Sequence, residues 1–122
     1  IPQSSTTEMI ANTREFISSV ERVSLLITDR LKSPLRCQFG DGEIHLSCST
    51  AIGRASDQFE AAITGAPVEM GFNNRYLLDA LRNSEGDEVK IQLNGPLSPM
   101  KVMPREGSDY LFLVLPVRLK TE

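Results

Sequence analysis

Apolar side chains recur at helical spacing in two segments of the chain. The first stripe consists of four residues three or four positions apart: Phe16, Val20, Val23 and Ile27. We expect this helix to span about Thr13–Leu26, with Thr13 as its N-cap. A second helix is expected over Asn73–Arg82, with Asn73 as a suitable N-cap. Its core-facing residues would be Leu77, Ala80 and Leu81.

Elsewhere apolar and polar residues alternate, which is typical of strands that bury one face. Residues 35–39 and 44–48 alternate in this way around Asp41 and Gly42, a pair that readily takes the positive φ of a tight turn. Pairing Phe39 with Ile44 places all six apolar side chains of this hairpin on one face. Further strands are expected near Thr6–Ala11, Ile52–Ile63, Val68–Phe72, Glu88–Leu93, Met100–Met103 and Tyr110–Val117.

This mixture of elements predicts an α+β fold. Strands flank each helix and are joined by short turns, which favours an antiparallel sheet with two helices packed on one face. A chain of 122 residues is the size of one domain, so we expect a single domain over residues 1–122. The order strand, helix, meander of strands occurs twice, which indicates an internal duplication although the two halves match poorly in sequence.

The last expected strand is apolar on both of its sides. Tyr110, Phe112 and Val114 would point one way, and the next set would point the other way: Leu111, Leu113, Leu115 and Val117. Pro116 is expected to end the ladder of hydrogen bonds. Either loops of the same domain cover this strand, or it forms an apolar groove for an outside partner. The nearby turn Gly95–Pro99 adds apolar groups held stiff by two prolines.

Composition and charge narrow the possible functions. The formal net charge of −3 argues against a free-standing nucleic-acid binder. No apolar run approaches the roughly 20 residues of a membrane span, so no membrane partner is expected. The chain opens without a methionine, and we expect it to be a piece of a longer one.

Residues that could carry chemistry are sparse. His45 is the single histidine, and Cys37 and Cys48 read as buried free thiols rather than metal ligands. No phosphate-binding loop or nucleophile elbow is present. We therefore expect no catalytic residue, no metal site and no cofactor.

Basic residues lie on the outer faces of both expected helices. They are Arg14, Arg22, Arg75 and Arg82. Such faces are most often simply solvated, and contact with the phosphates of DNA is the alternative.

Three motifs resemble segments of the bacterial sliding clamp, the beta subunit of the replicative DNA polymerase III. Residues 71–81, GFNNRYLLDAL, resemble that family's G-F-N-x-x-Y-L-L-D-x-L segment. Residues 94–99, NGPLSP, resemble the strand and turn around its peptide site, and residues 113–119, LVLPVRL, resemble its near-terminal tail. Ile1–Pro2 resembles the opening of its third domain. The whole chain therefore looks like the C-terminal domain of a clamp.

The resemblance implies the DNA-clamp fold and a non-catalytic processivity factor of the cytoplasm. In this family two chains, each of three domains, close head-to-tail into a ring around duplex DNA, with helices lining the hole. The four helix arginines named above become the DNA-facing residues, although Glu15, Glu21 and Asp79 dilute their charge. The homodimer interface would involve Leu25, Leu26 and Asp57, and Arg54 departs from the acidic pattern of the family there.

The resemblance also implies a peptide-binding groove. In the family this groove accepts short linear motifs of DNA polymerases, the clamp loader, mismatch-repair proteins and ligase. Its positions fall here on Tyr76, Leu97, Pro99, Leu113, Leu115, Pro116, Val117 and Arg118. Two other interpretations stay open: a small-molecule-binding α+β module with a pocket around Tyr76, Leu97 and Leu113, and an enzyme.

Overall fold

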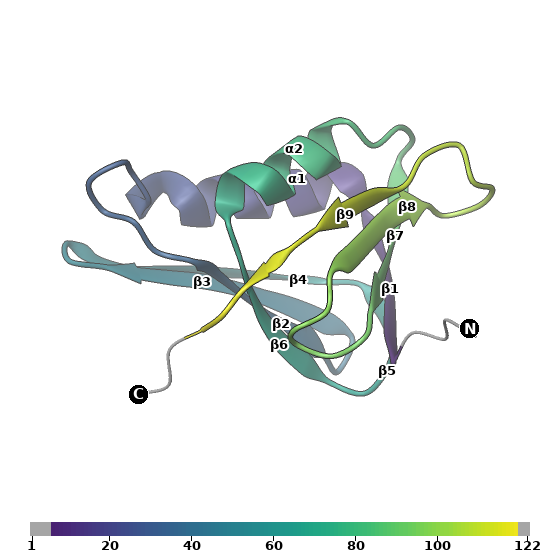
Figure 1. The fold of residues 1–122 in the computed structure, drawn as a ribbon, viewed down its shortest axis with the longest axis horizontal. Helices are drawn as coiled ribbons and strands as arrows, with labels where there is room; N and C mark the ends of the chain where they lie inside the picture. The colour runs from purple at the N-terminus through teal and green to yellow at the C-terminus, as the bar shows by residue number, and fades with distance from the viewer. Residues whose placement is uncertain (1–5, 120–122) are drawn as a thin grey trace.

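A computed structural model describes residues 6–119 (Figure 1). The resemblance at Ile1–Pro2 and the tail Lys120–Glu122 lie outside the described residues. The elements are, in chain order, β1 (Thr7–Asn12), α1 (Thr13–Val23), the 3₁₀ helix η1 (Ser24–Leu26), β2 (Leu35–Gly40), β3 (Glu43–Thr50), β4 (Gly53–Glu60), β5 (Ala62–Gly65), β6 (Val68–Phe72), α2 (Asn74–Arg82), β7 (Glu88–Leu93), β8 (Met100–Pro104), β9 (Phe112–Val114) and β10 (Pro116–Val117).

The strands form two antiparallel sheets rather than one. Their orders are β5-β1-β7-β8-β9 and β10-β6-β2-β3-β4. The two helices lie on the same side of the sheets in Figure 1. Buried apolar side chains of both helices and of strands from both sheets form one core cluster. The predicted α+β class is therefore confirmed, with the strands divided between two sheets.

The two halves of the chain are built alike. Each half gives one strand, one α-helix and four further strands. The first half runs from β1 to β5 and the second from β6 to β10. The first strand of each half, β1 or β6, pairs with the last strand of its own half, β5 or β10. It also pairs with the second strand of the other half, β7 or β2. Each sheet therefore contains strands from both halves of the chain. The repeated element order agrees with the internal duplication that the sequence indicates.

The predicted N-cap of α1 is wrong by one residue. Asn12 is the N-cap, because its side chain accepts a hydrogen bond of 2.8 Å from the backbone N–H of Glu15. The chain is still extended at Asn12, so the last residue of β1 also caps the helix, and Thr13 is its first, buried residue. The expected cap of α2 is confirmed, since the side chain of Asn73 accepts from the amides of Arg75 and Tyr76.

The predicted β2–β3 hairpin is confirmed in its register. Phe39 pairs with Ile44, and Asp41 and Gly42 both have positive φ, 54° and 75°. Positive φ at both central residues defines the turn whose twist suits adjoining antiparallel strands. All six apolar side chains of the hairpin are buried, including Cys37 and Cys48, which are free thiols. Burial raises the pKa of both thiols.

Two expected strands each divide between the two sheets. The expected strand over Ile52–Ile63 is β4 and β5, and the one over Tyr110–Val117 is β9 and β10. The chain crosses between sheets at Ala61 and again at Leu115. Pro116 does not end a ladder as predicted, because it begins β10, a place that its missing N–H allows. An unbroken apolar pattern does not show where a strand changes its hydrogen-bonding partner.

Candidate functional site

A row of exposed apolar side chains follows the C-terminal strands. Val114 is buried and Phe112 is half-buried, and the alternate positions point outward. These outward side chains are Leu111, Leu113, Leu115 and Val117. Loops of residues 6–119 therefore do not cover this side of the strand, which excludes the covered-strand interpretation. Leu111 belongs to the row but is absent from the predicted site, although the same alternation contains it.

Two neighbouring segments extend the apolar row. Helix α2 packs against β9 (Figure 1). Tyr76 in the first turn of α2 is 64% exposed. Leu97 lies exposed in the turn between β7 and β8. Because Met100 pairs with Val114, this turn lies just past the end of β9, where Leu115 follows. The structure thus brings Tyr76 of α2 and Leu97 of the β7–β8 turn to the apolar row of the C-terminal strands.

The remaining predicted groove residues frame this region. Pro99 and Arg118 are exposed, and Pro116 is half-buried against β6. We call the exposed row together with these neighbours the apolar groove, after the peptide-binding groove that the resemblance implies: Tyr76, Leu97, Pro99, Leu111, Leu113, Leu115, Pro116, Val117 and Arg118.

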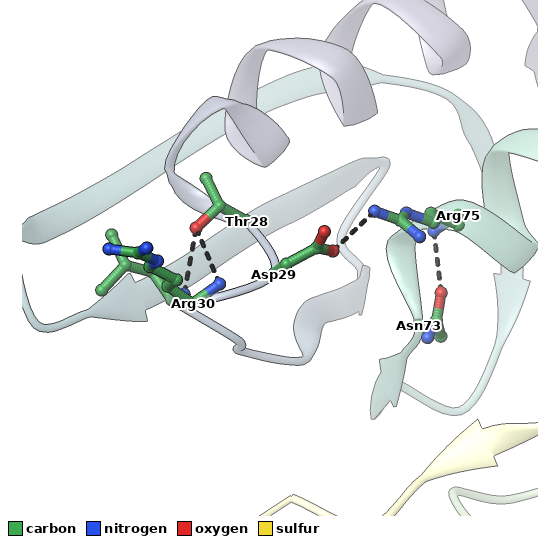
Figure 2. A network of polar contacts seen from close by, with 6 residues as sticks. Thr28, Asp29, Arg30, Asn73 and Arg75 are labelled. Carbon is green, nitrogen blue, oxygen red and sulfur yellow. Dashed lines mark hydrogen bonds and ion pairs between the residues drawn. The ribbon is translucent and has the colours of Figure 1, made fainter.

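A depression of about 420 Å³ adjoins Val117 at the end of the apolar groove. Loop residues 27–34 form one side of it, and Asn73–Arg75 at the start of α2 form the other. Figure 2 shows the ion pair between Asp29 and Arg75, 3.0 Å long, that spans these two sides. Sequence reasoning missed this depression, because the loop has no periodicity and meets α2 only in the folded chain.

Three of the four helix arginines form ion pairs within the domain. The pairs are Arg22 with Asp57 at 2.6 Å, Arg82 with Glu21 at 2.6 Å, and Arg75 with Asp29 at 3.0 Å. Arg14 forms no ion pair with the described residues. Exposed pairs of this kind contribute at most about 1 kcal/mol, so a phosphate could exchange for the carboxylate. The positive charge of the helix faces is nevertheless partly neutralised.

Asp57 is turned toward its own domain. Its carboxylate accepts hydrogen bonds from Ser19 at 2.8 Å and from Arg22, both on α1. Burial acts to raise the pKa of Asp57, but the hydrogen bonds from Arg22 and Ser19 outweigh it and hold that pKa below its usual value. The structure thus joins Arg22, predicted to face DNA, to Asp57, predicted to lie at the dimer interface.

The two leucines at the end of α1 differ in exposure. Leu25 is 80% exposed, whereas Leu26 is half-buried and packs against the core. An interface that uses both leucines requires both to be exposed, and Leu26 does not meet this requirement fully, because the 3₁₀ turn points it inward. Beside them, β4 is the open edge of its sheet.

Groups that could support catalysis are dispersed in the described part of the chain. No three His, Cys, Asp or Glu side chains gather there in a way that could hold a metal ion. His45 is exposed and lies 3.1 Å from Glu43. None of the described helices has the length and apolar character needed to cross a membrane. The most distinctive feature of residues 6–119 is thus the apolar groove, which is a surface suited to binding.

Comparisons with known proteins agree on one family. The sequence model described as "DNA polymerase III beta subunit, C-terminal domain" matches residues 1–118. The beta sliding clamp of Bacillus subtilis is 33% identical over 121 residues, which are 97% of this chain and 32% of that protein.

Solved structures give the same result. The crystal structure of the Bacillus subtilis sliding clamp superposes with a TM-score of 0.91 at 31% identity, over 98% of this chain and 32% of that chain. A Bartonella birtlesii clamp bound to griselimycin superposes with a TM-score of 0.88 at 32% identity, over the same shares of the two chains. The present chain spans about a third of the length of these relatives.

Proposed function

The chain belongs to the DNA polymerase III beta subunit family, whose C-terminal domain it matches, and we propose that it serves as that domain of a sliding clamp. In this role it is a processivity factor in DNA replication: part of a ring that encircles duplex DNA and docks polymerases and other partners. It binds and positions other molecules and catalyses nothing itself. It would act in the cytoplasm.

The apolar groove is the observation that carries this proposal. Four large apolar side chains stand at least 60% exposed on α2, on the β7–β8 turn, on β9 and just after β9: Tyr76, Leu97, Leu113 and Leu115. Water contact with such a patch is unfavourable, and contiguous exposed apolar patches mark interaction sites. A short linear motif of a polymerase, a clamp loader or a repair protein would place apolar anchors there. The small-molecule alternative loses support, because these side chains lie open rather than around an enclosed pocket.

The helix faces supply the proposed contact with DNA. Helices α1 and α2 lie on one side of the molecule (Figure 1). All four arginines belong to these helices and are exposed. Contacts between arginines and phosphates hold DNA without reading its sequence. A ring needs only weak contacts of this kind, which fits a net charge of −3 and arginines that already have carboxylate partners.

The end of α1 and the edge of β4 supply the proposed contact between two chains. Leu25 offers an exposed apolar side chain, and β4 offers unpaired backbone groups that a strand of a second chain can meet. These two features adjoin, since η1 packs beside β4. We place the homodimer interface there.

Retention on DNA of different shapes tests the proposed function. A chain of the relatives' full length, loaded onto a nicked circular plasmid, should stay bound while the circle is intact. Cutting the plasmid once, far from the protein, should release the protein, because a ring slides off an end. Equal retention on circular and linear DNA would show binding by affinity and would contradict the clamp.

A further inference from the structure

Strand β10 is held to the domain by little backbone pairing. It forms two residue pairs with β6, Pro116 with Phe72 and Val117 with Gly71. The strand in the equivalent place of the other sheet, β5, forms four pairs with β1. Proline has no N–H to donate, so the β10 ladder is weaker still. Another contact must help to hold the C-terminal strand.

Gly71 provides a notch for that contact. It is buried, and a Cβ atom at this position would lie 2.5 Å from Cδ2 of Leu119 and 2.8 Å from the carbonyl oxygen of Val117. Both distances are far inside ordinary van der Waals contact. The φ angle of Gly71 is not positive, so its backbone conformation does not demand glycine. What requires glycine here is the close approach of the C-terminal segment.

Leu119 fills this notch and is itself half-buried. The chain is thus held at two points, by the ladder at Pro116 and Val117 and by the side chain of Leu119 two residues later. Arg118 lies between them, and both Val117 and Arg118 belong to the apolar groove. A side chain in the notch, or the loss of Leu119, would release these two groove residues together.

We infer that Gly71 and Leu119 form a latch that fixes the C-terminal strand and so positions Val117 and Arg118 for a bound peptide. The part that concerns the peptide rests on the proposed function, whereas the latch itself does not. Gly71 and Leu119 are positioning residues, because they act on the peptide through Val117 and Arg118.

Two variants and one control test the latch in the 122-residue chain. Gly71→Ala should push the segment away, and Leu119→Ala should leave the notch empty while keeping all backbone pairs possible. Gly40→Ala is the matched control, since a Cβ at Gly40 would meet Pro67 at 3.1 Å in the same sheet but at the far end of β2. Dispersed NMR spectra of the β2–β3 hairpin would show that each variant is folded.

The first measurement is the backbone order parameter of Val117, Arg118 and Leu119. It should lie near 0.85 in the wild type and the control and fall below about 0.6 in both latch variants. The second measurement is the affinity for a glutamine-and-leucine-rich clamp-binding peptide. Both latch variants should bind about tenfold more weakly, a change in Kd that corresponds to ~1.4 kcal/mol.

Each possible outcome decides one part of the inference. Unchanged order parameters in Leu119→Ala and in folded Gly71→Ala would overturn the latch. A loosened segment with unchanged peptide affinity would overturn its positioning role. A wild type that binds no peptide would overturn the proposed groove and with it the positioning role, while the order parameters would still report on the latch.

Discussion

Leu115 and Ile52 are equally exposed apolar residues, each at 67%, in very different surroundings. Leu115 stands among the other apolar residues of the groove, whereas Ile52 lies in the turn between β3 and β4. A single exposed apolar side chain is ordinary, and a cluster of them marks a binding surface. The context of a residue, more than its exposure, therefore indicates its role.

Changing Leu115 to Asp should abolish peptide binding. The incoming peptide would bury an unpaired carboxylate, which costs several kcal/mol and so reduces affinity by more than about a hundredfold. Ile52→Asp is the matched control and should bind like the wild type. A fluorescence-anisotropy titration compares the two variants, and equal losses in both would remove Leu115 from the site.

Asp57 makes the stability of the domain depend on pH. Its pKa is lowered by folding, so its stabilising effect is present at neutral pH and is lost as the pH falls below about 4. Asp57→Asn should lower the free energy of unfolding by about 0.5–1 kcal/mol at pH 7, discounted because the pair is partly exposed. Denaturant titrations at pH 7 and pH 2.5 should show this difference shrink at the lower pH, where the carboxylate begins to take up a proton.

Asp29→Asn is the control for this prediction, since the ion pair of Asp29 with Arg75 is far more exposed. It should change stability little at either pH. A loss in Asp57→Asn that persists undiminished at pH 2.5 would show that the hydrogen bond from Ser19, rather than the charge, is what matters.

Helix α1 and the 3₁₀ helix η1 that follows it contribute to two proposed surfaces, the DNA-contact face and the homodimer interface. Helix α1 presents arginines on its outer face, and η1 at its end presents Leu25 beside the edge strand β4. The same helix holds Asp57 of β4 through Ser19 and Arg22, which ties the two surfaces together. A change at Arg22 can therefore affect DNA contact and chain association together.

Leu25→Ala should weaken association between chains without affecting the fold. The side chain is 80% exposed in the domain, so burial at an interface is its main source of stabilisation, roughly 1.5–3 kcal/mol. Leu26→Ala should instead lower domain stability, because Leu26 packs against the core. Sedimentation velocity of a chain of the relatives' full length gives the association, and thermal unfolding gives the stability. Unaltered association in Leu25→Ala would move the interface elsewhere.

Among the helix arginines, reversing Arg14 should weaken DNA retention most. Arg22, Arg75 and Arg82 must leave carboxylate partners before they bind a phosphate, whereas Arg14 has no such partner among residues 6–119. Arg14→Glu should reduce the slope of log K against log salt by about 0.9 for one lost phosphate contact. Arg82→Glu should reduce it less. Equal slopes for wild type and both variants would assign these residues to a solvated face.

At the scale of the whole molecule, local features were predictable from the sequence and long-range ones were not. The Asp41–Gly42 turn and the Asn73 cap depend on neighbouring residues, and both were predicted. The division into two sheets depends on partners far away in the chain, and over residues 110–117 a continuous apolar pattern conceals it. The ion pair of Arg82 with Glu21 joins residues 61 positions apart, which no periodicity reveals.

Some features of the apolar groove were likewise predictable from the sequence, and others were not. Alternation in the last strand predicted an apolar row on each of its sides but left open whether loops cover it, and the resemblance supplied Tyr76 and Leu97 from other elements. Neither source predicted that Leu119 would occupy the notch at Gly71, because that contact depends on the path of the chain after β10. The whole surface exists only because the crossing at Leu115 carries the chain from one sheet to the other.

Chemical-shift mapping of the 122-residue chain shows directly whether a peptide binds at the apolar groove. A glutamine-and-leucine-rich clamp-binding peptide should bind weakly, with Kd near millimolar or about −4 kcal/mol, because the apolar side chains of this chain lie open rather than around an enclosed pocket. The largest shifts should cluster at Tyr76, Leu97, Leu113 and Leu115. Shifts clustered on the hairpin of Cys37 and Cys48, with the C-terminal strands unaffected, would contradict the account.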